Sequence, residues 1–226
     1  MSSVDLFTGI HKGVRGMLFE TALTVQNLDV ENPAAIASLI DDIHTVFSFL
    51  QEHGEHEDDR IFPTVAGEEP QLAAALDAEH KSHMALAARL EDELQFLAEA
   101  ATPVQRADAL AVVRRSYHDF VAGQLLHMNH EEREMLPATQ RLISNGNLAE
   151  IRRGIVGSIP PDRYIQWLGW MLPALTPQEL TEMFDGLATA PPQFGQMVEA
   201  VAADVLPAER WNELHAMTES IVMEAA

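Results

Sequence analysis

Two short segments of the chain repeat the same pattern of metal-binding side chains. Residues 53–57 read His-Gly-Glu-His-Glu, and residues 127–131, which begin 74 positions later, read His-Met-Asn-His-Glu. In both segments a proline, Pro63 or Pro137, follows the last glutamate by six positions. Imidazoles combined with carboxylates are ligands that suit iron or manganese. The repeat therefore predicts two halves of one metal centre.

Helical spacing determines which side chains of each segment act together. Residues four apart in a helix differ by about 40° in direction, so His53 projects with Glu57, and His127 with Glu131. The apolar residues before each pair recur on the same side of the helix, which directs both pairs into a hydrophobic interior. Burial of a charge is costly unless a partner or a metal compensates for it. Glutamates from facing helices can bridge two ions.

Cap residues and prolines divide the first 145 residues into four long helices. Asn32-Pro33 and Thr102-Pro103 each combine an N-cap residue with proline at the first helical position, and Pro70 opens a third helix. No alternating strand pattern competes with the helical one. Because short connections make consecutive helices antiparallel, we expect an all-α, up-down-up-down four-helix bundle. The expected helices run from about residue 4 to 28, from 33 to a stop at Pro63, from Pro70 onward, and from 103 to near Pro137.

Two further histidines fall at the depth of the repeated segments. His53 and His127 each lie ten residues before the proline that follows them. His80 lies ten residues after Pro70, and His11 lies seven residues after the expected start of the first helix. At a rise of about 1.5 Å per residue, antiparallel packing brings these positions to one layer. Each of the four helices therefore contributes a histidine to the same level.

The order His11, His53 with Glu57, His80, His127 with Glu131 resembles the hemerythrin-like (HHE cation-binding) domain. The resemblance covers roughly residues 4–142 and implies a bundle that holds a non-haem di-iron centre, with two oxo- or hydroxo-bridged iron ions. It implies that Glu57 and Glu131 bridge the irons. The terminal ligands that it implies are His11, His53, His80 and His127.

The pattern departs from that of the oxygen-carrying hemerythrins at two places. Those carriers have two histidines four apart on the third helix, whereas His80 and His83 are three apart. They also have an aspartate five residues after the last histidine, where this chain has Glu131 at four. A missing imidazole leaves coordination positions for water or an exogenous ligand. The departures therefore favour redox turnover or sensing over reversible oxygen carriage.

Three other histidines flank the expected site, and no catalytic residue is expected beyond the metal ligands. His56 and His130 point about 60° away from His53 and His127, the first histidines of their segments, so they are interpreted as hydrogen-bond partners of the ligands or as surface groups rather than as ligands. His83 fits three interpretations equally: an additional ligand, a hydrogen-bond donor to a ligand, or a core residue.

Composition excludes several other classes of protein. The 226 residues are 47% hydrophobic and 22% charged and contain no cysteine, which excludes a disulfide scaffold, an iron–sulfur cluster and thiol catalysis. The net charge of −21 repels nucleic acid and anionic membranes, so neither is an expected partner. The chain has no signal-peptide pattern and no apolar run near the roughly 20 residues of a membrane span. We therefore expect a cytoplasmic protein.

The character of the sequence changes after residue 146. Nine of the ten histidines precede this point, and all three tryptophans follow it. Prolines divide the remainder into short helices, so we expect a bundle domain in residues 1–146 and a helical extension in residues 147–226. The tryptophans and methionines of the extension are interpreted as core residues. A homodimer interface and a lid are the alternatives.

These features predict one of two functions. The first is an oxidoreductase that turns over peroxide, nitric oxide or oxygen at a carboxylate-bridged di-iron centre. The alternative is an oxygen- or iron-binding or sensing protein without turnover, in which the C-terminal extension responds to occupancy of the bundle. Sustained consumption of the oxidant would indicate the enzyme, and a single stoichiometric change would indicate the sensor.

Overall fold

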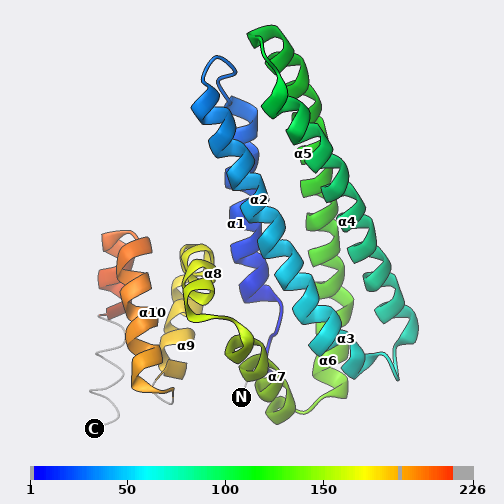
Figure 1. Cartoon of the computed structure of the whole chain (residues 1–226). Helices are drawn as coiled ribbons and strands as arrows, with labels where there is room; N and C mark the ends of the chain where they lie inside the picture. The colour runs from blue at the N-terminus through cyan, green and yellow to red at the C-terminus, as the bar shows by residue number, and fades with distance from the viewer. Residues whose placement is uncertain (1–2, 188–189, 216–226) are drawn as a thin grey trace. The chain divides into compact units, whose positions relative to one another are not determined.

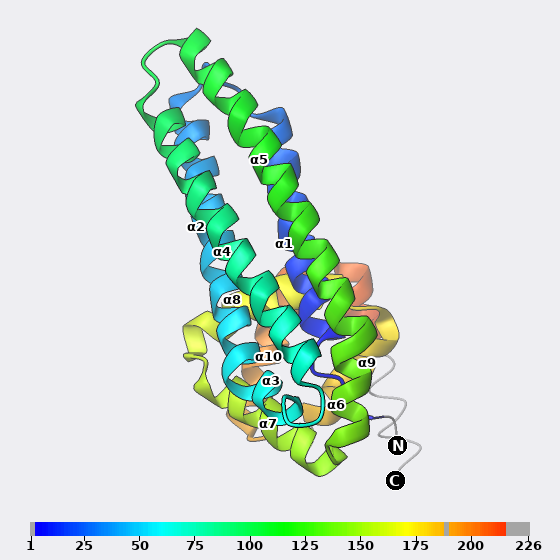
Figure 2. The same cartoon turned by 90° about the vertical axis from the view of Figure 1, so that its right-hand side faces the viewer.

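The computed structural model describes residues 3–187 and 190–215. These residues form helices and no strand, which confirms the predicted all-α class. Figures 1 and 2 show the four longest helices side by side, with consecutive helices running in opposite directions. They are α1 (Thr8–Asn27), α2 (Pro33–His56), α4 (Pro70–Glu99) and α5 (Pro103–His130).

The predicted helix starts at Pro33 and Pro103 are confirmed by their caps, whereas the first helix begins at Thr8 and not at about residue 4 as predicted. The side chain of Asn32 accepts hydrogen bonds from the backbone N–H groups of Ala34 and Ala35, at 3.1 and 3.3 Å. Thr102 forms a capping box with Gln105, in which each side chain accepts from the other residue's backbone N–H. These bonds satisfy donors that the first turn of a helix leaves without partners.

The predicted helix stop at Pro63 is wrong, because that helix continues to Val65, and the helix with Pro137 near its end continues to Leu142. Each motif helix passes through a five-residue π-helical segment, η1 (Glu57–Ile61) or η2 (Glu131–Met135), and continues as α3 (Phe62–Val65) or α6 (Leu136–Leu142). In both, the N–H of the residue before the proline donates to the carbonyl five positions back. Proline has no N–H, so it fits where the hydrogen-bond register returns from five to four. Each motif helix therefore continues past its proline.

The bundle helices bury one face each. The buried residues of α2 recur every three or four positions, which is the period of an amphipathic helix: Ile36, Leu39, Ile43, Val46, Phe49 and His53. On α4, however, Met84 is 68% exposed, although it lies four residues after His80 and eight after the buried Leu76. Steps of four residues drift by about 40° each, so a run of Leu76, His80 and Met84 leaves the buried face after two steps.

Contacts divide the chain into two units, Met1–Thr8 with Met17–Ile155, and Gly9–Gly16 with Val156–Ala226. The division into a bundle domain in residues 1–146 and a helical extension in residues 147–226 stays a prediction. The first unit contains most of α7 (Asn145–Ser158). The second contains α8 (Pro161–Ala174), α9 (Pro177–Leu187) and α10 (Pro192–Val205), each of which begins at a proline.

The second unit has a hydrophobic core of its own, formed by Leu168, Leu172, Leu175, Leu180, Val198, Ala202, Leu206 and Leu214. In the same unit Lys12 donates to both carboxylate oxygens of Glu179, at 2.5 and 2.6 Å. Glu179 also accepts from the backbone N–H of Thr176 at 2.7 Å, so it closes the N-terminal cap of α9. Burial raises the pKa of Glu179, but its bonds to Lys12 and Thr176 outweigh this and hold the pKa below its usual value.

The helix that spans Pro33–Val65 is long and apolar enough to cross a membrane, with a mean hydropathy of 1.2 and 28% of its apolar window buried. The prediction that the chain has no apolar stretch of membrane-spanning length is therefore wrong by length and composition. Core helices of soluble proteins pass the same test. The regular burial pattern of α2 is that of a bundle helix.

Candidate metal centre

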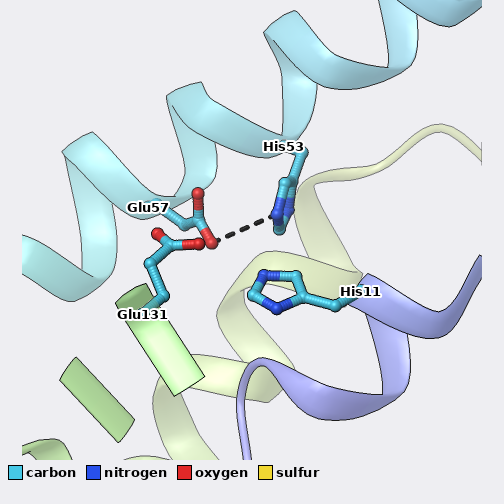
Figure 3. Close-up of side chains that lie close together, drawn as sticks. All are labelled: His11, His53, Glu57 and Glu131. Atoms are coloured by element: carbon cyan, nitrogen blue, oxygen red, sulfur yellow. Dashed lines mark ion pairs between the residues drawn. The ribbon is translucent and has the colours of Figure 1, made fainter. Parts of the chain in front are cut away.

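Two groups of four residues place ligand atoms within 4.8 Å of one another. The first consists of His11, His53, Glu57 and Glu131, and the second of Glu57, His80, His127 and Glu131. Figure 3 shows the first group, with the carboxylates of Glu57 and Glu131 directed toward one another beside the rings of His11 and His53. The structure thus brings together all six residues predicted as ligands, and both glutamates belong to both groups.

The motif helices position the shared glutamates at the point where α-helix becomes π-helix. Glu57 and Glu131 are the first residues of η1 and η2, and they are 1% and 0% exposed. Glu57 Oε1 lies 3.2 Å from His53 Nε2 on the preceding turn, and Glu131 Oε1 lies 3.5 Å from His127 Nε2. Interruptions of this kind are frequent at functional sites. The i, i+4 pairs therefore point inward, as their apolar neighbours indicated.

His80 is held between two carboxylates. Its Nδ1–H donates to Asp58 Oδ1 at 3.0 Å, and its Nε2 lies 3.5 Å from Glu57 Oε2. Burial lowers the pKa of His80, but Glu57 and Asp58 outweigh this and raise the pKa to about 9. The imidazole must therefore release a proton before its Nε2 can bind a cation.

His127 is held by a carboxylate of the neighbouring helix, Glu79. Its Nδ1–H donates to Glu79 Oε2 at 2.7 Å, and its Nε2 lies 2.8 Å from the Nε2 of His80. Burial lowers the pKa of His127, and the contact with Glu79 offsets only part of that effect. Burial raises the pKa of Glu79, but hydrogen bonds from His127 and His130 bring it below the usual value.

The three flanking histidines lie outside both groups. His130 donates from Nδ1 to Glu79 Oε1 at 2.8 Å, and its side chain is 31% exposed. His83 packs edge-on against His127, with ring centroids 5.1 Å apart. Burial, followed by the charges of His127 and His80, lowers the pKa of His83 to about 4. His56 is half-buried. The roles of these three residues in metal binding stay predictions.

The sequence reasoning missed Asp58 and Glu79. Each stands next to an expected ligand, since Asp58 follows Glu57 and Glu79 precedes His80. Adjacent helical residues point about 100° apart, so a carboxylate beside a ligand is directed toward the neighbouring helix rather than into the same site. That adjacency was the signal that could have identified both residues.

A surface pocket of about 420 Å³ lies beside the end of α5. It is lined by Leu72, Leu126, Asn129, His130, Arg133 and Glu134. Through His130 the pocket is connected by hydrogen bonds to Glu79, and through Glu79 to His127. The deeply buried group is thus linked to the surface by two side chains.

Comparison with protein families matches residues 2–139 to the Hemerythrin HHE cation binding domain. The matched segment is more than half of the chain and contains all six clustered residues. The chain belongs to this family. Comparisons with curated proteins and with solved structures found no match.

Membership of the HHE family fits the donor set of the buried cluster. Two imidazoles and two carboxylates in each group form a site consistent with cation binding. The residue five positions after His127 is Glu132, which is half-buried and belongs to neither group, whereas Glu131 belongs to both. The carboxylate that points into the cluster is therefore Glu131, four residues after His127.

Proposed function

We propose that this HHE protein binds two iron ions and uses them in redox turnover of a small oxidant, namely peroxide, nitric oxide or oxygen. The observation that carries the proposal is the sharing of Glu57 and Glu131 between two groups that each contain two histidines. Such sharing is what a carboxylate-bridged pair of ions requires. A single-ion site needs no second set of imidazoles.

In this proposal the two glutamates bridge, and the histidines are terminal ligands of one ion each. His11 and His53 would hold one ion, and His80 and His127 would hold the other, because these pairs fall in different groups. A bound iron pair supplies the capacity to gain and lose electrons, which zinc and magnesium lack. Each group offers four protein atoms, which is fewer than the six of octahedral coordination. Water or a small oxidant can therefore occupy the remaining positions.

The surrounding residues supply orientation and a dry environment. Asp58 and Glu79 accept from the Nδ1–H groups of His80 and His127, which leaves the Nε2 atoms directed at the cluster. Full burial of His11 and Glu131 excludes bulk water from the cluster and strengthens its electrostatic interactions. The small size of the proposed oxidants matches a centre that is reached through a closely packed bundle.

The alternative function is oxygen or iron sensing without turnover. It is favoured by the C-terminal helices, which have a hydrophobic core of their own but contribute no residue to either metal group within the described residues. C-terminal helices of this kind suit a responding element better than a catalytic one. In this case oxygen or iron occupancy would change the protein once per binding event.

Multiple-turnover assays separate the two functions. The iron-loaded protein is mixed with excess hydrogen peroxide alone, and with nitric oxide or oxygen in the presence of ascorbate as electron donor. We expect sustained consumption by the wild-type protein and by His44→Ala, whose ring pairs with Glu91 on the exposed surface. Glu57→Ala is expected to be inactive. Consumption that stops after one equivalent supports the sensor and contradicts the enzyme.

A further inference from the structure

We propose that Glu79 is a positioning residue, which fixes the ring and the tautomer of His127 for metal binding and is itself held in place by His130. The inference rests on the proposed function, because it assigns His127 to one of the two ions. It concerns two residues that belong to neither metal group.

The first step is the direction of the hydrogen bonds. Glu79 accepts at both of its oxygens, from His127 Nδ1 at 2.7 Å and from His130 Nδ1 at 2.8 Å. An ionised carboxylate can only accept, so both Nδ1 atoms carry the proton. An imidazole that binds a cation through one nitrogen carries its proton on the other, so the nitrogen of His127 that is left for a cation is Nε2.

The second step is where that lone pair points. His127 Nε2 is the atom that lies 3.5 Å from Glu131 Oε1 and 2.8 Å from His80 Nε2, inside the second metal group. If Nδ1 lost its acceptor, the proton could move to Nε2, and the ring would present a donor where a cation needs a lone pair. Glu79 thus holds the proton of His127 on Nδ1, on the side of the ring opposite the Nε2 that contacts His80.

The third step is the role of His130. The side chain of Glu79 is 36% exposed, so water competes for its oxygens and its conformation needs a second anchor. The hydrogen bond from His130 to Oε1 supplies that anchor, so that both carboxylate oxygens of Glu79 are held, Oε1 by His130 and Oε2 by His127. His130 therefore acts on His127 through Glu79. This gives the middle histidine of the second repeated segment a function other than metal ligation.

The tautomer can be tested before any metal is added. In ¹⁵N NMR spectra of the full-length metal-free protein, we expect the wild type to show a protonated Nδ1 and an unprotonated Nε2 at His127. In Glu79→Ala this preference should be lost. Glu79→Gln keeps the side-chain shape and provides a second variant if the alanine variant does not fold by circular dichroism. An unchanged His127 tautomer in the folded variants would overturn the proposal.

Metal affinity provides the second readout. Ferrous iron is titrated anaerobically against a competing chelator, and we expect Glu79→Ala and Glu79→Gln to weaken binding of one of the two ions by about 10- to 100-fold. The matched control is Glu91→Gln, which removes another α4 carboxylate that contacts a histidine of α2, His44, on the exposed surface. It should bind iron as the wild type does. Wild-type affinity in the Glu79 variants would also overturn the proposal.

A double-mutant cycle tests whether His130 acts through Glu79. We expect His130→Ala to weaken the same ion, and Glu79→Ala/His130→Ala to be no weaker than Glu79→Ala alone. Additive losses would contradict the anchor role. If the wild type binds no iron while its His127 tautomer depends on Glu79, the proposed function fails and the positioning contact stands.

Discussion

The two metal groups share their glutamates but not their histidines, and this predicts two classes of ligand variant. Glu131→Ala removes one of four donor atoms from both groups, whereas His127→Ala removes one donor from the second group only. Four-ligand structural metal sites bind with about 10–16 kcal/mol, or roughly 3 kcal/mol per ligand. Since about 1.4 kcal/mol is tenfold in affinity, each lost donor costs about 100-fold. We therefore expect Glu131→Ala to weaken both ions and His127→Ala to weaken one.

The assay is an anaerobic ferrous titration, followed by metal analysis of the desalted protein. Glu132→Ala is the matched control, because it removes the adjacent carboxylate, which is half-buried and outside both groups. Circular dichroism checks that each variant remains helical. If Glu131→Ala retains either ion at wild-type affinity, or if Glu132→Ala loses both ions, the assignment of the shared carboxylate is wrong.

Further predictions follow from individual residues. Because the pKa of His80 is raised to about 9, binding at lower pH must displace its proton, and the apparent iron affinity should fall by about tenfold per pH unit for this one proton as the pH decreases from about 8 to about 6.5. Calorimetry in buffers of different ionisation enthalpy measures the released proton, and a pH-independent affinity would contradict this. His83→Phe should leave the iron affinity unchanged, and loss of one ion would make His83 a ligand. Gly16→Ala should raise the free energy of unfolding by about 1 kcal/mol, since a Cβ there meets nothing within 4 Å in mid-helix. Gly13→Ala should lower it, since its Cβ would lie 3.1 Å from the backbone of Met171, and urea denaturation compares the two variants.

Local sequence signals predicted the bundle because its helices begin at residues that act within one turn. Asn32 and Thr102 accept from backbone groups two or three positions away, and these contacts depend on no other part of the fold. The spacing of histidine and glutamate, together with their depth from the helix ends, brought the six clustered residues to one layer. Both signals depend only on helical geometry.

The features that the sequence did not reveal depend on register and on helix rotation. A proline normally ends a helix, and continuation past Pro63 requires a π-helical segment that has no sequence signature. Exposure of Met84 follows from the rotation of α4 about its own axis. The contacts of Glu79 and Asp58 join different helices, so adjacency to a ligand marks both residues as candidates, but only the packing shows which histidine each one contacts.

Metal content and an optical spectrum of the protein expressed in iron-replete medium test the central claim most directly. The shared carboxylates predict about two irons per chain, with the charge-transfer bands of a bridged ferric pair. One iron per chain without these bands, stoichiometric zinc, or no bound metal would contradict the proposed di-iron centre.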